Sequence, residues 1–143
     1  MTLTVEDIRD FQNRKAGWIK PDNSYVFCDY LKHFEVLGLE EKYQRYYEEQ
    51  SDLDYEQVRM EEEDSEDEYY HPAWHRFDAS GVARQRLYEE LIDEGYVRIG
   101  LFTHSRKNYI EVEGKKSRFN ELEKDFKFIK DVMEIDNIKY RTI

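Results

Sequence analysis

Apolar side chains recur every three or four residues in several stretches of the chain, which is the spacing of one face of an α-helix. The clearest stretch begins after Ser117, and its apolar positions are Phe119, Leu122, Phe126, Ile129 and Met133. A second apolar face follows a candidate cap at Asp78 or Ser80 and ends before Gly95, and it comprises Val82, Ala83, Leu87, Tyr88, Leu91 and Ile92. Both patterns predict helices that bury one side against a core.

The first segment of the chain predicts a helix with a well-defined start. Thr4 is a candidate N-cap, and Asp7 occupies the position three residues later that completes a capping box. Gly17 follows a basic stretch and suits the C-terminal cap of this helix. Further helices are predicted at three places: after a cap at Asp29, over residues 39–50, and over residues 52–60.

Two other stretches place β-prone residues on either side of a turn or polar loop. Residues 18–19 and 25–28 flank Pro21-Asp22-Asn23-Ser24, whose residue types favour a turn, so a β-hairpin is predicted. Residues 95–102 and 108–114 predict a second hairpin, and the tail near Ile138 adds a short strand. The chain therefore predicts an α+β fold. A small antiparallel sheet from two hairpins carries helices on one face, and an acidic helical and loop segment is inserted.

The charge of the chain is concentrated in one block. The chain has 143 residues, which predicts a single domain over residues 1–143. Its net charge is −11. Residues 40–70 hold fourteen acidic and three basic residues, whereas the rest of the chain holds nineteen of each. From Glu61 to Glu68 like charges crowd together with no apolar side chain to compensate for ordering. Residues 61–70 are therefore predicted to form an acidic flexible loop within the domain.

The composition excludes several classes of protein. Cys28 is the single cysteine, which rules out an internal disulfide and a cysteine-rich zinc site. The first residues show neither the basic nor the apolar region of a secretory signal. No apolar run approaches the roughly 20 residues of a membrane helix. We therefore expect a cytoplasmic protein that makes no membrane contact.

Three short stretches carry a resemblance to known proteins, namely Gly17-Trp18-Ile19-Lys20-Pro21-Asp22, His33, and Gly95-Tyr96-Val97-Arg98-Ile99. Together they resemble a loose group of small uncharacterised bacteriophage proteins, although Asn23 stands where that group usually has glycine. The resemblance implies a phage origin, and hence the cytoplasm of a host cell, but it implies no catalytic residue. By analogy, a small acidic phage protein is expected to be an anti-defence inhibitor of a host nucleic-acid-handling system.

The acidic block is the candidate functional surface. Spaced carboxylates can imitate phosphates in a basic groove, and tyrosine rings attract arginine side chains. The leading hypothesis is a binding protein that inhibits a basic, nucleic-acid-binding host factor by nucleic-acid mimicry. The block itself repels nucleic acid. Its candidate partner-binding residues are Glu48, Glu49, Asp52, Asp54, Tyr55, Glu56, Glu61, Glu62, Glu63, Asp64, Glu66, Asp67, Glu68, Tyr69 and Tyr70. The alternative is a solvated segment that only maintains solubility.

No motif in the sequence fixes a reaction, so we predict a binding protein without a cofactor or metal rather than an enzyme. A small metal-dependent enzyme that uses His71, His75 and nearby carboxylates is one alternative. Pro72 disfavours the helix that such ligand spacing needs. Cys28 and His33 form a weaker candidate pair of nucleophile and base. The simpler interpretation is that Cys28 is a buried cysteine of a strand without a catalytic role.

The sequence also contains a modest basic patch, which leaves two more alternative functions open. The patch comprises Arg106, Lys107, Lys115, Lys116 and Arg118. These side chains can contact nucleic acid, with Tyr109 or Phe102 stacking on bases. They can also pair with the acidic block of a second copy, which predicts a self-associating accessory protein and a dimer.

Overall fold

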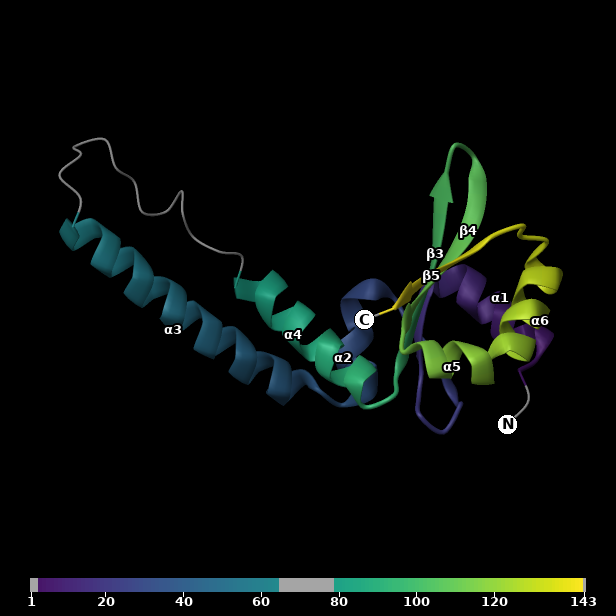
Figure 1. Cartoon of the computed structure of the whole chain (residues 1–143), viewed down its shortest axis with the longest axis horizontal. Helices are drawn as coiled ribbons and strands as arrows, with labels where there is room; N and C mark the ends of the chain where they lie inside the picture. The colour runs from purple at the N-terminus through teal and green to yellow at the C-terminus, as the bar shows by residue number, and fades with distance from the viewer. Residues whose placement is uncertain (1–2, 65–78, 143) are drawn as a thin grey trace. The chain divides into compact units, whose positions relative to one another are not determined.

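The computed structural model, which describes residues 3–64 and 79–142, contains a five-stranded sheet (Figure 1). Its strands are β1 (Ala16–Ile19), β2 (Tyr25–Phe27), β3 (Val97–His104), β4 (Lys107–Gly114) and β5 (Ile138–Thr142). The helices are α1 (Val5–Arg14), the 3₁₀ turn η1 (Tyr30–Lys32), α2 (His33–Leu37), α3 (Glu40–Asp64), α4 (Ala79–Asp93), α5 (Lys116–Glu121) and α6 (Glu123–Met133). The predicted α+β class is confirmed.

The order of the strands in the sheet is β2-β1-β3-β4-β5. The pairs β1–β2, β1–β3 and β3–β4 are antiparallel, whereas β5 runs parallel to β4. The sheet is therefore mixed, and the prediction of an antiparallel sheet is wrong at this edge. The reason is the connection through α5 and α6, because a helical crossover brings the chain back in the direction of the strand it left.

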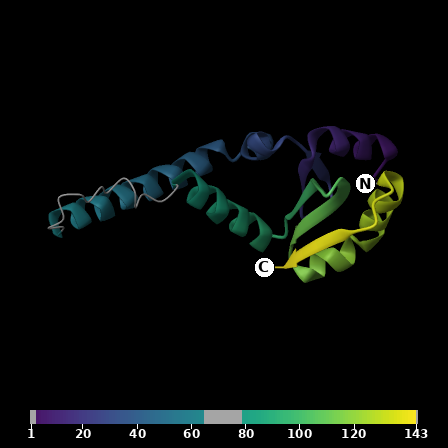
Figure 2. The ribbon, with the colours of Figure 1, turned by 90° about the horizontal axis from the view of Figure 1, so that it is seen from above.

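The chain divides into two compact units. Residues 1–37 and 89–143 form the first, called here the sheet unit, and residues 38–88 form the second, called the acidic unit. In the sheet unit, α1, α5 and α6 lie on one side of the sheet, while η1 and α2 lie on the other (Figures 1 and 2).

The first face of the sheet forms the core with α1, α5 and α6. Side chains alternate between the two faces of a strand, so Val97 and Ile99 of β3 point to the same side as Ile110 and Val112 of β4. The buried residues of this core are Leu3, Ile8, Phe11, Ile19, Val97, Ile99, Ile110, Val112, Phe119, Leu122, Phe126, Ile129 and Ile135.

The second face of the sheet is covered at β1 by aromatic side chains. Trp18 is fully buried, with its ring centroid 5.8 Å from that of His33 and 6.2 Å from that of Tyr96. His33 itself is 1% exposed. The histidine of the phage-like pattern is therefore a core residue, packed beside the tryptophan of the same pattern.

The start of α1 is formed as predicted. The Asp7 backbone N–H donates to the Thr4 hydroxyl at 3.2 Å, and the Thr4 backbone N–H donates to the Asp7 carboxylate at 2.8 Å, which completes the capping box. The predicted end at Gly17 is wrong, because Lys15 adopts the left-handed conformation that closes the helix. Gly17 instead lies in β1.

Two other helix predictions also need correction. Residues 39–50 and 52–60, predicted as separate helices, belong to the continuous helix α3, which extends to Asp64. The acidic loop predicted to begin at Glu61 is therefore helical over residues 61–64, and residues 65–70 lie outside the described residues. The helix predicted to begin at Ser117 is broken at Leu122 into α5 and α6, and Lys115 precedes its first turn.

We expect Gly17→Ala to lower the free energy of unfolding by about 1 to 3 kcal/mol. An alanine Cβ at this position would lie 2.7 Å from the backbone carbonyl oxygen of Val26 in the paired strand, which cannot turn aside. Gly100→Ala in β3 is the matched control. Its Cβ would lie 2.7 Å from the hydroxyl of Tyr30 and 2.8 Å from the ring of Phe102, and both are ends of movable side chains.

Urea unfolding followed by circular dichroism measures both variants. A smaller loss for Gly100→Ala than for Gly17→Ala is the expected result. Equal losses would show that the close approach of β2 is not the reason for glycine at position 17.

Candidate functional site

Helix α3 holds most of the predicted partner-binding residues. It carries eleven acidic and three basic residues among 25, a net charge of −8. A helix of this length is about 37 Å long, so its net charge averages about one negative charge per 5 Å. One strand of B-DNA carries roughly one charge per 3.4 Å of axis. The charge density of the helix thus approaches that of a nucleic-acid strand.

The exposed part of α3 combines a line of carboxylates with apolar side chains on either side of that line. Glu48, Asp52 and Glu56 are four residues apart and exposed, so they follow one another along a single face at intervals of about 6 Å. Leu53 and Tyr55 are each 64% exposed. An open hollow of about 400 Å³ is lined by Glu49, Asp52, Leu53 and Glu56. We call Glu48, Asp52, Leu53, Tyr55 and Glu56 the acidic ridge.

The structure describes only part of the predicted acidic surface. Among the expected residues, Glu48, Glu49, Asp52, Tyr55 and Glu56 are described and exposed. Residues 61–64 have a described helical backbone. Residues 66–70, which include Tyr69 and Tyr70, lie outside the described residues.

Within the acidic unit, α4 contacts α3 through Tyr43, Tyr46 and Glu49, and Glu49 borders the acidic ridge. Arg86 donates to the Glu49 carboxylate at 2.8 Å, and its guanidinium lies 3.8 Å from the centroid of the Tyr46 ring. The hydroxyls of Tyr43 and Ser80 are 2.6 Å apart. Tyr43 and Tyr46, which lie within the acidic block, thus contact the protein's own α4, and Glu49 is partly neutralised by Arg86.

A second charged surface lies on the second face of the sheet, across β3, β4 and β5. The register places Arg98 opposite Glu113 and Phe102 opposite Tyr109, and it places Arg141 of β5 beside Glu113. We call this surface the charged sheet face, and it comprises Arg98, Gly100, Phe102, Lys107, Tyr109, Glu111, Glu113, Lys139 and Arg141. A hollow of about 240 Å³ lies over Gly100, beside Tyr30 and Phe102.

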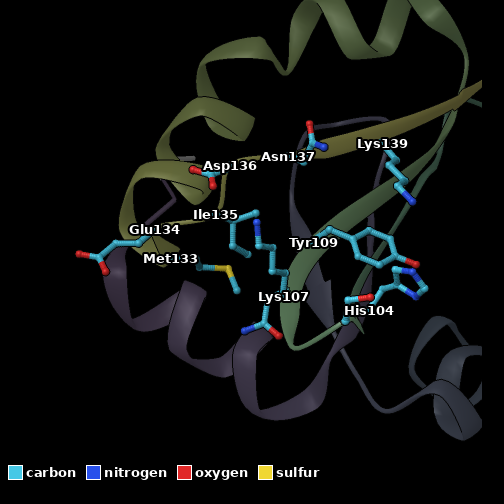
Figure 3. A pocket seen from close by; sticks show the side chains of 11 residues that line it. His104, Lys107, Tyr109, Met133, Glu134, Ile135, Asp136, Asn137 and Lys139 are labelled. Carbon is cyan, nitrogen blue, oxygen red and sulfur yellow. The ribbon is translucent and has the colours of Figure 1, made fainter.

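A cavity of about 500 Å³ opens where the β3–β4 turn meets the connection from α6 to β5 (Figure 3). Lys107, Tyr109 and Lys139 all line it. Figure 3 shows the His104 ring beside the Tyr109 hydroxyl end and Lys107 near Ile135, whereas Glu134 points away. The Lys139 ammonium lies 4.2 Å from the centroid of the Tyr109 ring, a cation–π contact. Met133 and Ile135 add apolar lining.

Sequence reasoning found only half of the charged sheet face. The alternation of Tyr109, Glu111 and Glu113 along residues 108–114 indicates a solvated face. Arg98, opposite Glu113, belongs to the same predicted hairpin, whereas Arg141 comes from β5. The pairing of Arg141 depends on the strand order, for which the sequence holds no local signal.

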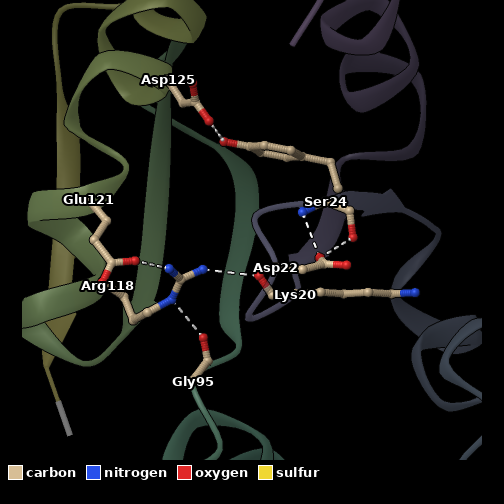
Figure 4. Close-up of polar contacts among 8 residues, drawn as sticks. Lys20, Asp22, Ser24, Gly95, Arg118, Glu121 and Asp125 are labelled. Atoms are coloured by element: carbon tan, nitrogen blue, oxygen red, sulfur yellow. Dashed lines mark hydrogen bonds and ion pairs between the residues drawn. The ribbon is translucent and has the colours of Figure 1, made fainter. Parts of the chain in front are cut away.

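Two residues of the predicted basic patch have structural roles instead. The Arg118 side chain is 8% exposed and donates to the backbone carbonyl oxygens of Gly95 at 2.8 Å and Lys20 at 3.0 Å, while also pairing with Glu121 (Figure 4). Lys115 donates to the backbone carbonyl of Asp93 at 2.6 Å. Arg118 thus joins α5 to two turns of the sheet unit and is not accessible to a ligand.

The alternatives that involve catalysis receive no support from the described residues. Cys28 is buried, and desolvation together with the neighbouring Asp29 raises the pKa of its thiol to about 11. A protonated thiol is a weak nucleophile at neutral pH. His71 and His75 lie outside the described residues. Within residues 3–64 and 79–142, no three His, Cys, Asp or Glu side chains are placed to hold a metal ion.

Comparison of the chain with protein-family models, curated protein sequences and solved structures finds no match. In the part of the chain that the structure describes, none of the helices combines the length and the apolar character needed to cross a membrane.

We expect the free energy of unfolding to fall as pH rises from about 8.5 towards 11, and Cys28 to contribute to this fall. The pKa of Cys28 is higher in the folded state than in the unfolded chain. Its contribution is therefore fully present below the unfolded pKa, and it is lost as pH rises towards the folded pKa. Desolvation and the 2.9 Å hydrogen bond to Asp125 also raise the pKa of Tyr25. The contribution of Tyr25 to stability is therefore likewise lost as pH rises.

Urea midpoints at about pH 7.5 and about pH 10 test this expectation in the native protein and in Cys28→Ala. The variant is expected to lose less stability between the two pH values. An identical loss in both proteins would contradict a role for this thiol.

Proposed function

We propose that the protein is a binding protein that presents the acidic ridge of α3 to a basic groove of a nucleic-acid-binding partner and thereby inhibits that partner. The observation that carries this proposal is the continuity of α3, since one helix holds eleven carboxylates over its whole length. Such an array resembles a nucleic-acid strand in charge density, as the comparison above indicates.

Fixed charges favour this function over a role as solvated linker. Flexible side chains and loops lose conformational entropy when they bind, whereas a helix has already ordered its backbone. The contacts of Arg86 with Glu49 and Tyr46 support α3 next to the ridge. Charge attraction accelerates the encounter with a basic surface, and this acceleration weakens as the salt concentration rises.

Apolar groups on the ridge supply a second part of the proposed interface. Leu53 and Tyr55 are both large and 64% exposed, beside Asp52 and Glu56. Tyrosine rings are common at the centres of interfaces, where they also accept arginine side chains. In this proposal the carboxylates guide the partner, and Leu53 and Tyr55 retain it.

The class of partner follows from the chemistry of the ridge and from the phage-like resemblance. A groove that accepts a line of carboxylates about 6 Å apart is one that accepts phosphates, so the partner is a nuclease or another nucleic-acid-handling enzyme. A phage-encoded protein of this kind would act on a host enzyme in an anti-defence role. The protein performs no reaction of its own in this proposal.

The test is capture of partners from host lysate on the immobilised native protein at low salt, about 50 mM, followed by elution at higher salt or with duplex DNA. The expected result is a basic nucleic-acid enzyme that both treatments release and whose activity the protein inhibits. A partner that duplex DNA does not displace would contradict nucleic-acid mimicry.

A variant with Glu48→Gln, Asp52→Asn and Glu56→Gln sharpens the test, because it removes three charges from the ridge and preserves side-chain shape. We expect it to weaken binding of the captured partner by about 1 to 2 kcal/mol, measured by calorimetry, and to flatten the salt dependence. The matched control changes Glu94→Gln, Asp131→Asn and Glu134→Gln, which are exposed acids of the sheet unit. Equal weakening by both variants would assign the effect to net charge alone.

A further inference from the structure

We propose that the charged sheet face binds single-stranded nucleic acid, with bases stacked on Phe102 and Tyr109 and phosphates held by Lys107 and Lys139. This surface lies in the sheet unit and is distinct from the acidic ridge, so the proposal does not rest on the proposed function. Aromatic rings provide contacts that any base can use, and cations beside them hold the backbone.

The aromatic pair is well placed for stacking. Phe102 and Tyr109 are direct cross-strand neighbours on β3 and β4, with ring centroids 5.6 Å apart and ring planes inclined by 25°. Both side chains are partly exposed. The two nearly parallel rings stack against each other across adjacent strands. Core aromatics such as Trp18 and Phe126, in contrast, are fully covered.

Lys107 and Lys139 supply the cations at the end of this face nearest the β3–β4 turn. The two carboxylates of the face are already paired, Glu111 with Arg141 at 2.5 Å and Glu113 with Arg98 at 4.0 Å. Lys107 and Lys139 both line the 500 Å³ cavity, and Glu134 and Asp136 line it too; Lys139 lies beside the Tyr109 ring and Lys107 near Ile135 (Figure 3). A cavity of this volume accommodates a nucleotide-sized group. Lys139 now covers the Tyr109 ring, and a stacked base would take its place while the ammonium moves to the adjacent phosphate.

Other ligands would use only part of this combination of aromatic rings and lysine side chains. An acidic peptide would satisfy Lys107 and Lys139 but would not need a flat pair of rings, and an apolar peptide would leave the cations without partners. The hollow over Gly100 extends the surface from the rings towards Arg98. From Arg98 to His104 the strand spans roughly 20 Å, which accommodates several nucleotides.

The experiment is fluorescence anisotropy of an end-labelled oligothymidylate of about eight nucleotides, titrated with the full chain at several salt concentrations. We expect saturable binding that weakens with salt. Replacing Lys107 and Lys139 together by alanine should weaken binding at least tenfold. It should also reduce the slope of log affinity against log salt by about 1.4, since each single-strand phosphate contact contributes roughly 0.7.

The matched control replaces Lys124 and Lys127, two exposed lysines of α6, by alanine and should leave affinity and slope unchanged. Tyr109→Ala should weaken binding by about fivefold to a hundredfold, and Tyr109→Phe should retain it, because stacking needs the ring and not the hydroxyl. Circular dichroism confirms that each variant is folded.

Three outcomes would overturn the proposal. The first is an absence of saturable oligonucleotide binding by the native chain at low salt. The second is an equal loss in the Lys107/Lys139 and Lys124/Lys127 variants, which indicates only general attraction. The third is binding of an acidic peptide with the sequence of residues 61–68 in place of the oligonucleotide, which assigns the face to a protein partner. None of these outcomes affects the ridge of α3, which is tested through a different partner and different variants.

Discussion

The register between β3 and β4 is the constraint on which both the core and the charged sheet face depend. Ile99 lies opposite Val112 and Leu101 opposite Ile110, so the apolar residues of both strands meet α1, α5 and α6. A shift by one residue would turn this whole set towards the other face of the sheet. The same register places Phe102 opposite Tyr109 and Arg98 opposite Glu113. The stable core therefore fixes the geometry of the polar face without any further requirement.

The two units use charge in opposite ways. In the sheet unit, charged side chains are tied to specific partners, as Arg141 is to Glu111 and Arg118 to the carbonyls of Gly95 and Lys20. On α3, by contrast, Glu48, Asp52 and Glu56 repeat one sign at intervals of four residues. Like charges at this spacing destabilise a helix by a few tenths of a kcal/mol per pair. This cost to stability on an exposed face supports the proposed role of α3 in binding.

Local signals in the sequence predicted local structure well and long-range structure poorly. The capping box of Thr4 and Asp7 was predictable because all its atoms come from four consecutive residues. The continuity of α3 was not, since contacts with α4 such as Tyr43 with Ser80 support a segment whose own apolar pattern is weak. The parallel pairing of β5 and the buried position of Arg118 depend on segments far apart in the chain. For the same reason, the acidic residues of the ridge were found from composition, but the charged sheet face was recognised only in part.

The separation of charge between the units also resolves an apparent conflict. A net charge of −11 argues against contact with nucleic acid when it is averaged over the molecule. The acidic unit, however, contains fifteen acidic and six basic residues, whereas the sheet unit contains eighteen and sixteen. Residues 38–88 thus carry −9 of the total and the sheet unit only −2. The cations around Tyr109 therefore belong to a nearly neutral unit, and the net charge of the whole chain does not by itself decide what this face binds.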